Sequence, residues 1–145
     1  MEIFTIGFAG KTAEQFFESL KRARVEQLVD VRLNNVSQLT GFTKKSDLPY
    51  LLASIAGIGY RHELLLAPAE DLLKAYRSKE IEWETYARRY QDLLVERAVA
   101  KELRPSDFAR RIALLCSEPK ADRCHRRLAA EYLQAQWRDV SIEHL

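Results

Sequence analysis

Four short apolar runs, each followed by residues with helical spacing, limit what this chain can fold into. They are residues 2–7, 27–32, 58–63 and 110–116. Runs of this length and composition are typical of strands that are buried on both faces of a sheet. Strands that alternate with helices predict an α/β fold: one three-layer domain over residues 1–145, with a mainly parallel sheet of about five strands and helices on both faces.

The helices are expected between these runs. Thr12 and Gln15 have the spacing of a capping box and predict the start of the first helix. The other helices are expected at residues 46–56, 69–78, 81–103 and 122–136. Residues 140–145 alternate between apolar and polar side chains, which indicates a half-exposed final strand.

Several polar residues directly follow the predicted strands. In open α/β sheets, ligands bind in the crevice beyond the carboxyl ends of the strands. This rule brings together residues that are far apart in the sequence: Gly7–Phe8, Asp30–Arg32, Glu63 and Cys116–Glu118. A long irregular segment, residues 33–45, also leaves this edge, and long loops in compact domains are often functional. The sequence therefore predicts a site at this edge of the sheet.

The stretch after the fourth apolar run holds the most reactive side chains. Both cysteines of the chain, Cys116 and Cys124, lie in it, and His125 follows the second. With Asp122 as the N-cap, the next three residues would form the first helical turn, where free N–H groups and the helix dipole favour anions. Arg126 adds positive charge, and a thiol in such a setting is expected to have a lowered pKa.

These residue types allow three chemistries. In the first, a cysteine is a nucleophile, and His125 or Glu118 accepts its proton. In the second, both cysteines and His125 bind zinc, with Glu118 or His144 as the fourth ligand. In the third, Cys116 and Cys124 form a reversible disulfide, which requires Cα atoms within about 7 Å of each other. All three remain open from the sequence alone.

The same residues also have structural interpretations. Free cysteine is among the most buried residue types and often only fills space in a core. Asp30 and Arg32 can form a structural ion pair. The aromatic stripe within residues 81–103 is typical of a helix that packs against a sheet.

Composition excludes some classes of partner. The net charge of +2 is too small to require a nucleic-acid partner. A nucleic-acid-binding or regulatory module nevertheless remains an alternative, because the chain has four basic doublets: Lys44–Lys45, Arg88–Arg89, Arg110–Arg111 and Arg126–Arg127. No run of about 18 apolar residues is present, so no membrane span is expected. We expect no signal peptide and no disulfide scaffold, and therefore a cytoplasmic protein.

Several motifs resemble those of a known family, the DUF488 proteins, which are small α/β proteins of uncharacterised function. The match extends over nearly the whole chain, and its most specific part is Cys116-x-Glu118 followed by Cys124-His125-Arg126. The supporting motifs are Thr5-Ile6-Gly7, Leu28-Val29-Asp30-Val31-Arg32 followed by Ser37, Gly59-Tyr60-Arg61-His62 and Ile142-Glu143-His144-Leu145. Phe8–Ala9 stand where the family commonly has His-Ser, and Leu66–Pro68 replace its usual Leu-Gly-Gly, so the ligand of this member can differ.

Motifs and resemblance together predict a small enzyme, or former enzyme, that binds a phosphate- or carboxylate-bearing ligand such as a nucleotide. The expected catalytic residues are Cys116, Cys124, His125, Glu118 and Asp30. The expected ligand-binding residues are Arg32, Arg126, Gly7 and Ser37. The alternatives are a non-catalytic nucleic-acid-binding module and a zinc-binding protein; no pattern identifies a cofactor.

Overall fold

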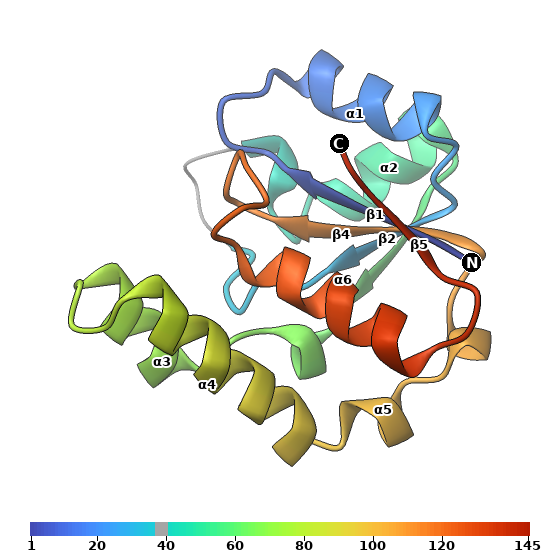
Figure 1. Ribbon diagram of the computed structural model, residues 1–145. Helices are drawn as coiled ribbons and strands as arrows, with labels where there is room; N and C mark the ends of the chain where they lie inside the picture. Colours follow the sequence, from blue (N-terminus) through green and yellow to red (C-terminus); the bar gives the residue numbers. More distant parts are fainter. Residues whose placement is uncertain (37–40) are drawn as a thin grey trace.

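The computed structural model describes residues 1–36 and 41–145, so Ser37 lies outside the described residues. Five strands form one sheet in the order β3-β2-β4-β1-β5, and every pairing between neighbours is parallel (Figure 1). The strands are β1 (Glu2–Gly7), β2 (Gln27–Asp30), β3 (Gly59–His62), β4 (Arg111–Cys116) and β5 (Ser141–His144). The predicted parallel sheet is confirmed.

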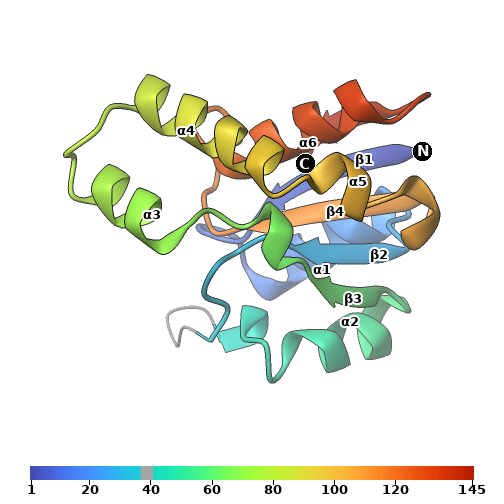
Figure 2. The same ribbon diagram turned by 90° about the horizontal axis from the view of Figure 1, so that it is seen from below.

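Helices cover both faces of this sheet, which confirms the three-layer α/β fold (Figures 1 and 2). One face carries α1 (Ala13–Arg22) and α2 (Leu48–Ala56). The other face carries α3 (Glu70–Arg77), α4 (Trp83–Glu96), α5 (Val99–Glu102) and α6 (His125–Gln136). Three short 3₁₀ helices complete the fold: η1 (Gly41–Thr43), η2 (Leu64–Leu66) and η3 (Pro105–Asp107).

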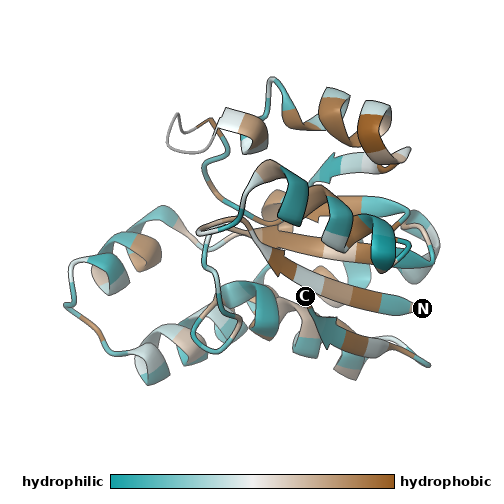
Figure 3. Ribbon diagram, turned by 90° about the horizontal axis from the view of Figure 1, so that it is seen from above, coloured by the Kyte–Doolittle hydropathy of each residue, from teal (hydrophilic) through white to brown (hydrophobic). Residues whose placement is uncertain are grey.

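The central strand β4 shows why the sheet has two cores. Ile112 and Leu114 pack with α4 and α6, whereas Ala113 and Leu115 pack with α1 and α2. Successive side chains of a strand point to opposite faces, so an apolar run without polar interruptions is needed here. Figure 3 shows brown, hydrophobic positions along the central strands of the sheet. By the same alternation, Cys116 lies on the face covered by α4 and α6.

Two helix starts differ in how well the sequence predicted them. The capping box is confirmed, because the Thr12 side chain accepts from the Gln15 N–H and the Gln15 side chain accepts from the Thr12 N–H. The predicted N-cap Asp122 is wrong: Cys124 is the N-cap, and α6 begins at His125. The reason is a turn before the helix, in which the Cys124 N–H donates to the Ala121 carbonyl oxygen at 3.2 Å.

The predicted helix over residues 81–103 is two helices. The chain turns at Ala98, whose φ of 54° is left-handed, and α5 then runs in a new direction. The turn brings Val99 and Leu103 into the core, and Arg97 donates from Nη1 to three carbonyl oxygens in and beside η2. Tertiary contacts therefore end α4 where helical periodicity alone would continue it.

We expect Ala98→Gly to raise the free energy of unfolding by about 0.5–1 kcal/mol. Left-handed backbone costs an alanine about 1–2 kcal/mol and costs glycine almost nothing, but glycine also adds entropy to the unfolded chain. Ala87→Gly inside α4 is the matched control and should cost about 1 kcal/mol. Urea denaturation of both variants measures the difference. Equal losses in the two variants would contradict a strained turn at Ala98.

The connections place a crevice at the end of β4. The helices that follow β1 and β2 lie on one face of the sheet, whereas α6, which follows β4 between them, lies on the other face. Chains that leave neighbouring strands in opposite directions open a gap at the carboxyl edge.

Among the described helices, none combines the length and apolar character needed to cross a membrane.

Candidate functional site

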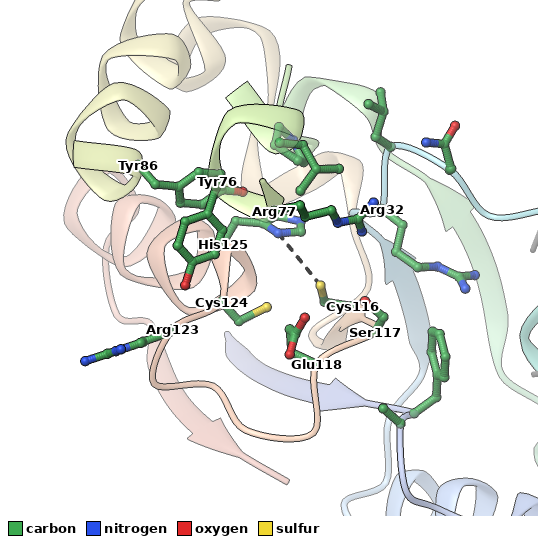
Figure 4. Close-up of a pocket in the computed structure, with 16 residues that line it drawn as sticks. Arg32, Tyr76, Arg77, Tyr86, Cys116, Ser117, Glu118, Arg123, Cys124 and His125 are labelled. Atoms are coloured by element: carbon green, nitrogen blue, oxygen red, sulfur yellow. Dashed lines mark hydrogen bonds between the residues drawn. The ribbon is translucent and has the colours of Figure 1, made fainter. Parts of the chain in front are cut away.

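A cavity of about 600 Å³ lies at the carboxyl edge of the sheet (Figure 4). The α3–α4 hairpin projects past the strand ends (Figure 1), and its side chains form one wall of the cavity. Its lining comes from six parts of the chain: Phe8 and Ala9; Arg32, Leu33 and Asn34; Pro68; Leu73, Tyr76, Arg77 and Tyr86; Cys116, Ser117 and Glu118; and Arg123, Cys124 and His125. The edge of the sheet at which the sequence predicts a site therefore contains a cavity.

Cys116 and His125 are in contact on the floor of this cavity (Figure 4). The Sγ atom of Cys116 lies 3.7 Å from Nδ1 of His125, and Nε2 of the same ring lies 2.8 Å from the carbonyl oxygen of Val31. A carbonyl oxygen can only accept, so Nε2 must carry a hydrogen. Nδ1 is then the atom that exchanges a proton with the thiol of Cys116, either as acceptor from S–H or as donor to the thiolate.

Cys124 completes a group of three. The two sulfurs and a ring nitrogen of His125 all lie within 4.8 Å of one another, and both cysteines are free thiols. The hydrogen bond with Cys124, followed by the charge of His125, holds the pKa of Cys116 well below its ordinary value although burial opposes this. The same hydrogen bond and burial raise the pKa of Cys124. The two thiols therefore differ: the surroundings favour the thiolate form at Cys116 and the protonated form at Cys124.

The surroundings of His125 favour its protonated form. Burial by itself would lower the pKa of His125, but the charge of Cys116 and the hydrogen bond to it raise this pKa overall. The ring also packs edge-on against Tyr90 at 5.6 Å between centroids. A thiolate and an imidazolium held in this way are a pair suited to nucleophilic chemistry.

Arg126 adds a second positive charge behind the cysteines. Only 1% of this side chain is exposed, and it has no carboxylate partner among the described residues. Its Nη1 donates to the carbonyl oxygen of Glu118 and, at 3.8 Å, to Sγ of Cys124, while its Nε has no partner in the described part of the chain. A buried guanidinium without a carboxylate favours negative charge nearby, so the charge of Arg126 opposes the hydrogen bond and the burial that raise the pKa of Cys124.

Gly7 makes this arrangement possible. The backbone of Glu118 passes so close to Gly7 that any Cβ atom there would overlap the Glu118 carbonyl oxygen, and it would also lie 2.8 Å from Nη1 of Arg126. The Ala9 N–H fastens the same loop by donating to the Ser117 carbonyl oxygen at 3.0 Å. Gly7 itself is not among the residues that line the cavity.

Asp30 and Arg32 form a buried ion pair at the side of the cavity. Asp30 is fully buried and accepts from Nε and Nη2 of Arg32, each at 2.8 Å, and from the Tyr60 hydroxyl at 2.8 Å. Burial and the charge of Asp30 raise the pKa of Tyr60. Arg32 lines the cavity and Asp30 does not, and the Arg32 guanidinium also lies 5.2 Å from the centre of the Phe8 ring. The contacts of Asp30 are those of a positioning residue for Arg32.

Of the other predicted residues, Glu118 lines the cavity, whereas Glu63 and His144 do not. Glu118 is exposed and lines the cavity. Glu63 pairs with Arg61 at 2.6 Å and does not line it. His144 bonds to the Thr5 hydroxyl at 2.7 Å on the edge strand β5, so neither it nor Glu118 joins the group of two sulfurs and one imidazole. Among the described residues, the group therefore lacks the predicted fourth protein ligand of a closed zinc site.

The sequence did not reveal the aromatic wall of the cavity. Tyr76 of α3 and Tyr86 of α4 pack with centroids 4.6 Å apart, and both line the cavity, next to Arg77 (Figure 4). Tyr86 fits the helical stripe that indicates a core position, and it is in the core as well. Helical spacing cannot show that α3 and α4 extend beyond the sheet, so this wall follows from tertiary structure alone.

Comparison with known families gives one match. The family described as "Domain of unknown function DUF488" matches residues 12–133, a span that contains Asp30, Arg32 and the whole Cys116–Arg126 segment. Searches among curated proteins and among solved structures found no match. The family match covers most of the 145 residues and agrees with the motifs in the sequence. The chain belongs to the DUF488 family.

Proposed function

We propose that this protein is a small enzyme in which the Cys116 thiolate attacks an anionic ligand held in the cavity. The observation that supports this most directly is the fixed pair of Cys116 and His125, in which the Val31 carbonyl oxygen sets the orientation of the imidazole. Cys116 lies at the end of the central strand and on the floor of a cavity, where a ligand can reach it.

The residues around Cys116 have separate roles in this proposal. Sγ forms a bond to an electrophilic carbon of the ligand, and the leaving group departs with the proton from Nδ1 of His125. Cys124 donates a hydrogen bond that stabilises the thiolate before attack. Water then attacks the same carbon, the S–C bond breaks so that Cys116 leaves as the thiolate, and the proton of the water passes through Glu118, which is exposed at the cavity, back to Nδ1 of His125.

Arginine side chains supply the attraction for an anion. Arg32, Arg77 and Arg123 line the cavity from three different segments. Arg77 and Arg123 have no ion-pair partner among the described carboxylates, whereas Arg32 is partly used by Asp30. The rings of Tyr76 and Tyr86 add flat apolar surface, which suits a phosphate- or carboxylate-bearing ligand with a planar ring, such as a nucleotide. Arg126 is buried behind Cys124 and acts through its charge.

Alkylation of Cys116 tests the nucleophile. An ordinary thiol with a pKa near 8.5 loses about tenfold in rate for each pH unit below that value. The lowered pKa of Cys116 should keep its rate with iodoacetamide nearly constant from pH 8 to 6. At pH 6 we expect the alkylation rate of Cys116 to exceed that of a free thiol about tenfold. The excess is no larger because a less basic thiolate is also less nucleophilic. Peptide mass spectrometry should locate the label on Cys116.

Variants and probes make this test specific. Cys116→Ser should remove the fast phase, whereas Cys124→Ser should keep it and shift its pH dependence upward. The ratio of the alkylation rate with iodoacetate to that with iodoacetamide should be about threefold or more higher for Cys116 than for a free thiol, because the cavity attracts anions. Arg123→Ala should reduce this preference, whereas Arg138→Ala, an exposed residue outside the cavity lining, should not.

Two outcomes would contradict the proposal. Labelling of Cys116 at the rate of a free thiol at every pH would exclude an activated nucleophile. A rate that rises only after treatment with a chelator would show that a metal ion covers the sulfurs, as in the zinc-binding alternative.

The nucleic-acid-binding alternative has less support. Of the basic doublets, Arg126 is buried and Arg111 is paired with Glu2, so two doublets do not present two free cations. A cytoplasmic setting remains part of the proposal, because reducing conditions keep Cys116 and Cys124 as the free thiols that this chemistry needs.

A further inference from the structure

We propose that Cys116 and Cys124 together reduce small hydroperoxides, with Cys116 as the attacking thiolate and Cys124 as the thiol that closes a disulfide. This inference rests on the reactivity proposed above for Cys116. It requires neither the anionic ligand nor the arginines of the cavity, so the two proposals can fail separately.

The positions of the two sulfurs support this inference first. They lie within 4.8 Å of each other, and the chain has no other cysteine, so each is the only intramolecular partner of the other. A disulfide requires about 2.05 Å between sulfurs. The gap to be closed is therefore at most about 2.8 Å, the difference between 4.8 Å and this bond length. Rotation of the two side chains and a small movement of the connecting loop, residues 117–123, must close it.

The place of Cys124 in the fold allows this movement. It is the N-cap of α6 with extended backbone angles (φ −137°, ψ 137°), and its side chain makes no capping hydrogen bond. Closing a bond at this position leaves the hydrogen bonds of the helix body intact. Residues Pro119, Lys120, Asp122 and Arg123 are exposed, so this part of the loop can adjust while the Glu118 backbone stays against Gly7.

The surroundings also suit a small oxidant. Cys116 and Cys124 are only 4% and 2% exposed, yet both line the cavity (Figure 4). A compact hydroperoxide can reach the sulfurs where a protein thiol cannot. His125 faces Cys116 with the proton that the departing alkoxide needs, and Arg126 donates to Sγ of Cys124, where it stabilises a second thiolate.

The first step oxidises Cys116. The thiolate attacks the terminal oxygen of the hydroperoxide, so that an S–O bond forms and the O–O bond breaks. The alkoxide, or hydroxide in the case of hydrogen peroxide, takes the proton from Nδ1 of His125 and leaves as an alcohol or as water. Cys116 is now a sulfenic acid, and His125 is neutral.

The second step forms the disulfide. Neutral His125 accepts the proton of the Cys124 thiol, and the new thiolate attacks the sulfur of Cys116. The S–S bond forms, the S–O bond breaks, and hydroxide leaves as water with the proton returned from His125. Two thiols are oxidised by two electrons and the peroxide is reduced by two. A dithiol reductant then restores both cysteines by thiol–disulfide exchange.

Peroxide treatment of the reduced protein tests the inference. One equivalent of hydrogen peroxide should lower the intact mass by about 2 Da, for two hydrogens, and remove both titratable thiols. Dithiothreitol should restore them, and the protein should stay monomeric on a non-reducing gel. With excess dithiol, the protein should consume peroxide at least about tenfold faster than free cysteine at pH 7.

Two serine variants separate the roles of the sulfurs. Cys124→Ser should stop at the sulfenic acid, which dimedone traps on Cys116, and should lose catalytic turnover. Cys116→Ser should form neither the sulfenic acid nor the disulfide. Retention of both thiols in the parent, a disulfide between two chains, or a stable sulfenic acid in the parent would each overturn the inference. If alkylation of Cys116 is fast in the same samples, the proposed function stands; if it is slow, both proposals fall.

Discussion

Replacing Asp30 by asparagine should lower the free energy of unfolding by about 3–5 kcal/mol, since the variant leaves the Arg32 guanidinium buried without its counter-charge. Asp30 is fully buried and Arg32 is 7% exposed, and two hydrogen bonds of 2.8 Å join their side chains. The Asp30 carboxylate now accepts hydrogen bonds from several donors, including the Tyr60 hydroxyl. An asparagine amide would place its own N–H donors against some of these donors, so those hydrogen bonds would be lost. Urea denaturation measures the loss.

Two further variants show whether the buried charge is the cause. Glu70→Gln breaks the exposed pair with Lys74 and should change stability by no more than about 0.5 kcal/mol. Asp30→Asn combined with Arg32→Gln removes both charges and should cost less than Asp30→Asn alone. If Asp30→Asn costs no more than Glu70→Gln, the ion pair does not stabilise this part of the fold. The double variant keeps the comparison possible where Asp30→Asn does not fold.

Gly7→Ala should be similarly severe, with a loss of about 3 kcal/mol or more, at the upper end of the cost of overpacking. The added Cβ would overlap the carbonyl oxygen of Glu118. That contact is with backbone, which cannot rotate away as a side chain can, so the Cys116–Glu118 segment must move. Fast alkylation of Cys116 should fall with stability, because the segment carries that residue.

Gly59→Ala is the matched control for Gly7→Ala. Gly59 also lies in a strand of the sheet, but a Cβ there would meet its nearest neighbour, the Glu26 carbonyl oxygen, at 3.7 Å, an ordinary contact. This variant should be close to neutral and should keep the alkylation rate of the parent. Equal stability and equal reactivity of the two variants would show that the Glu118 loop is not held against β1.

Much of the fold could be predicted because its signals are local. Apolar runs such as Ile112–Cys116 are found where a strand is buried on both faces, and the Thr12–Gln15 capping box needs only residues three apart. The alternation of strands and helices then leads to a parallel sheet, and the topology of such a sheet places the ends of β1, β2 and β4 together. The location of the candidate site followed from this rule and from the residue types.

Other features could not be predicted because they depend on distant parts of the chain. Helical spacing continues through Ala98, but the packing of Val99 and Leu103 turns the chain there. Asp122 has the chemistry of an N-cap, yet a turn between Ala121 and Cys124 places the helix start later. In each case a tertiary contact is worth more than the local preference that it overrides.

By itself, the sequence determined the α/β class, the parallel sheet, and the edge at which Cys116, Cys124, His125 and Arg32 gather. Only the tertiary structure decided how these residues are arranged around one another. It placed Asp30 behind Arg32, closed the Glu118 loop over Gly7, and set the imidazole of His125 between Val31 and Cys116. Protonation depends on burial and on charges within a few ångströms, and the imidazole beside Cys116 is oriented by the Val31 carbonyl oxygen, 94 residues away along the chain, so spacing cannot reveal which cysteine is favoured as the thiolate.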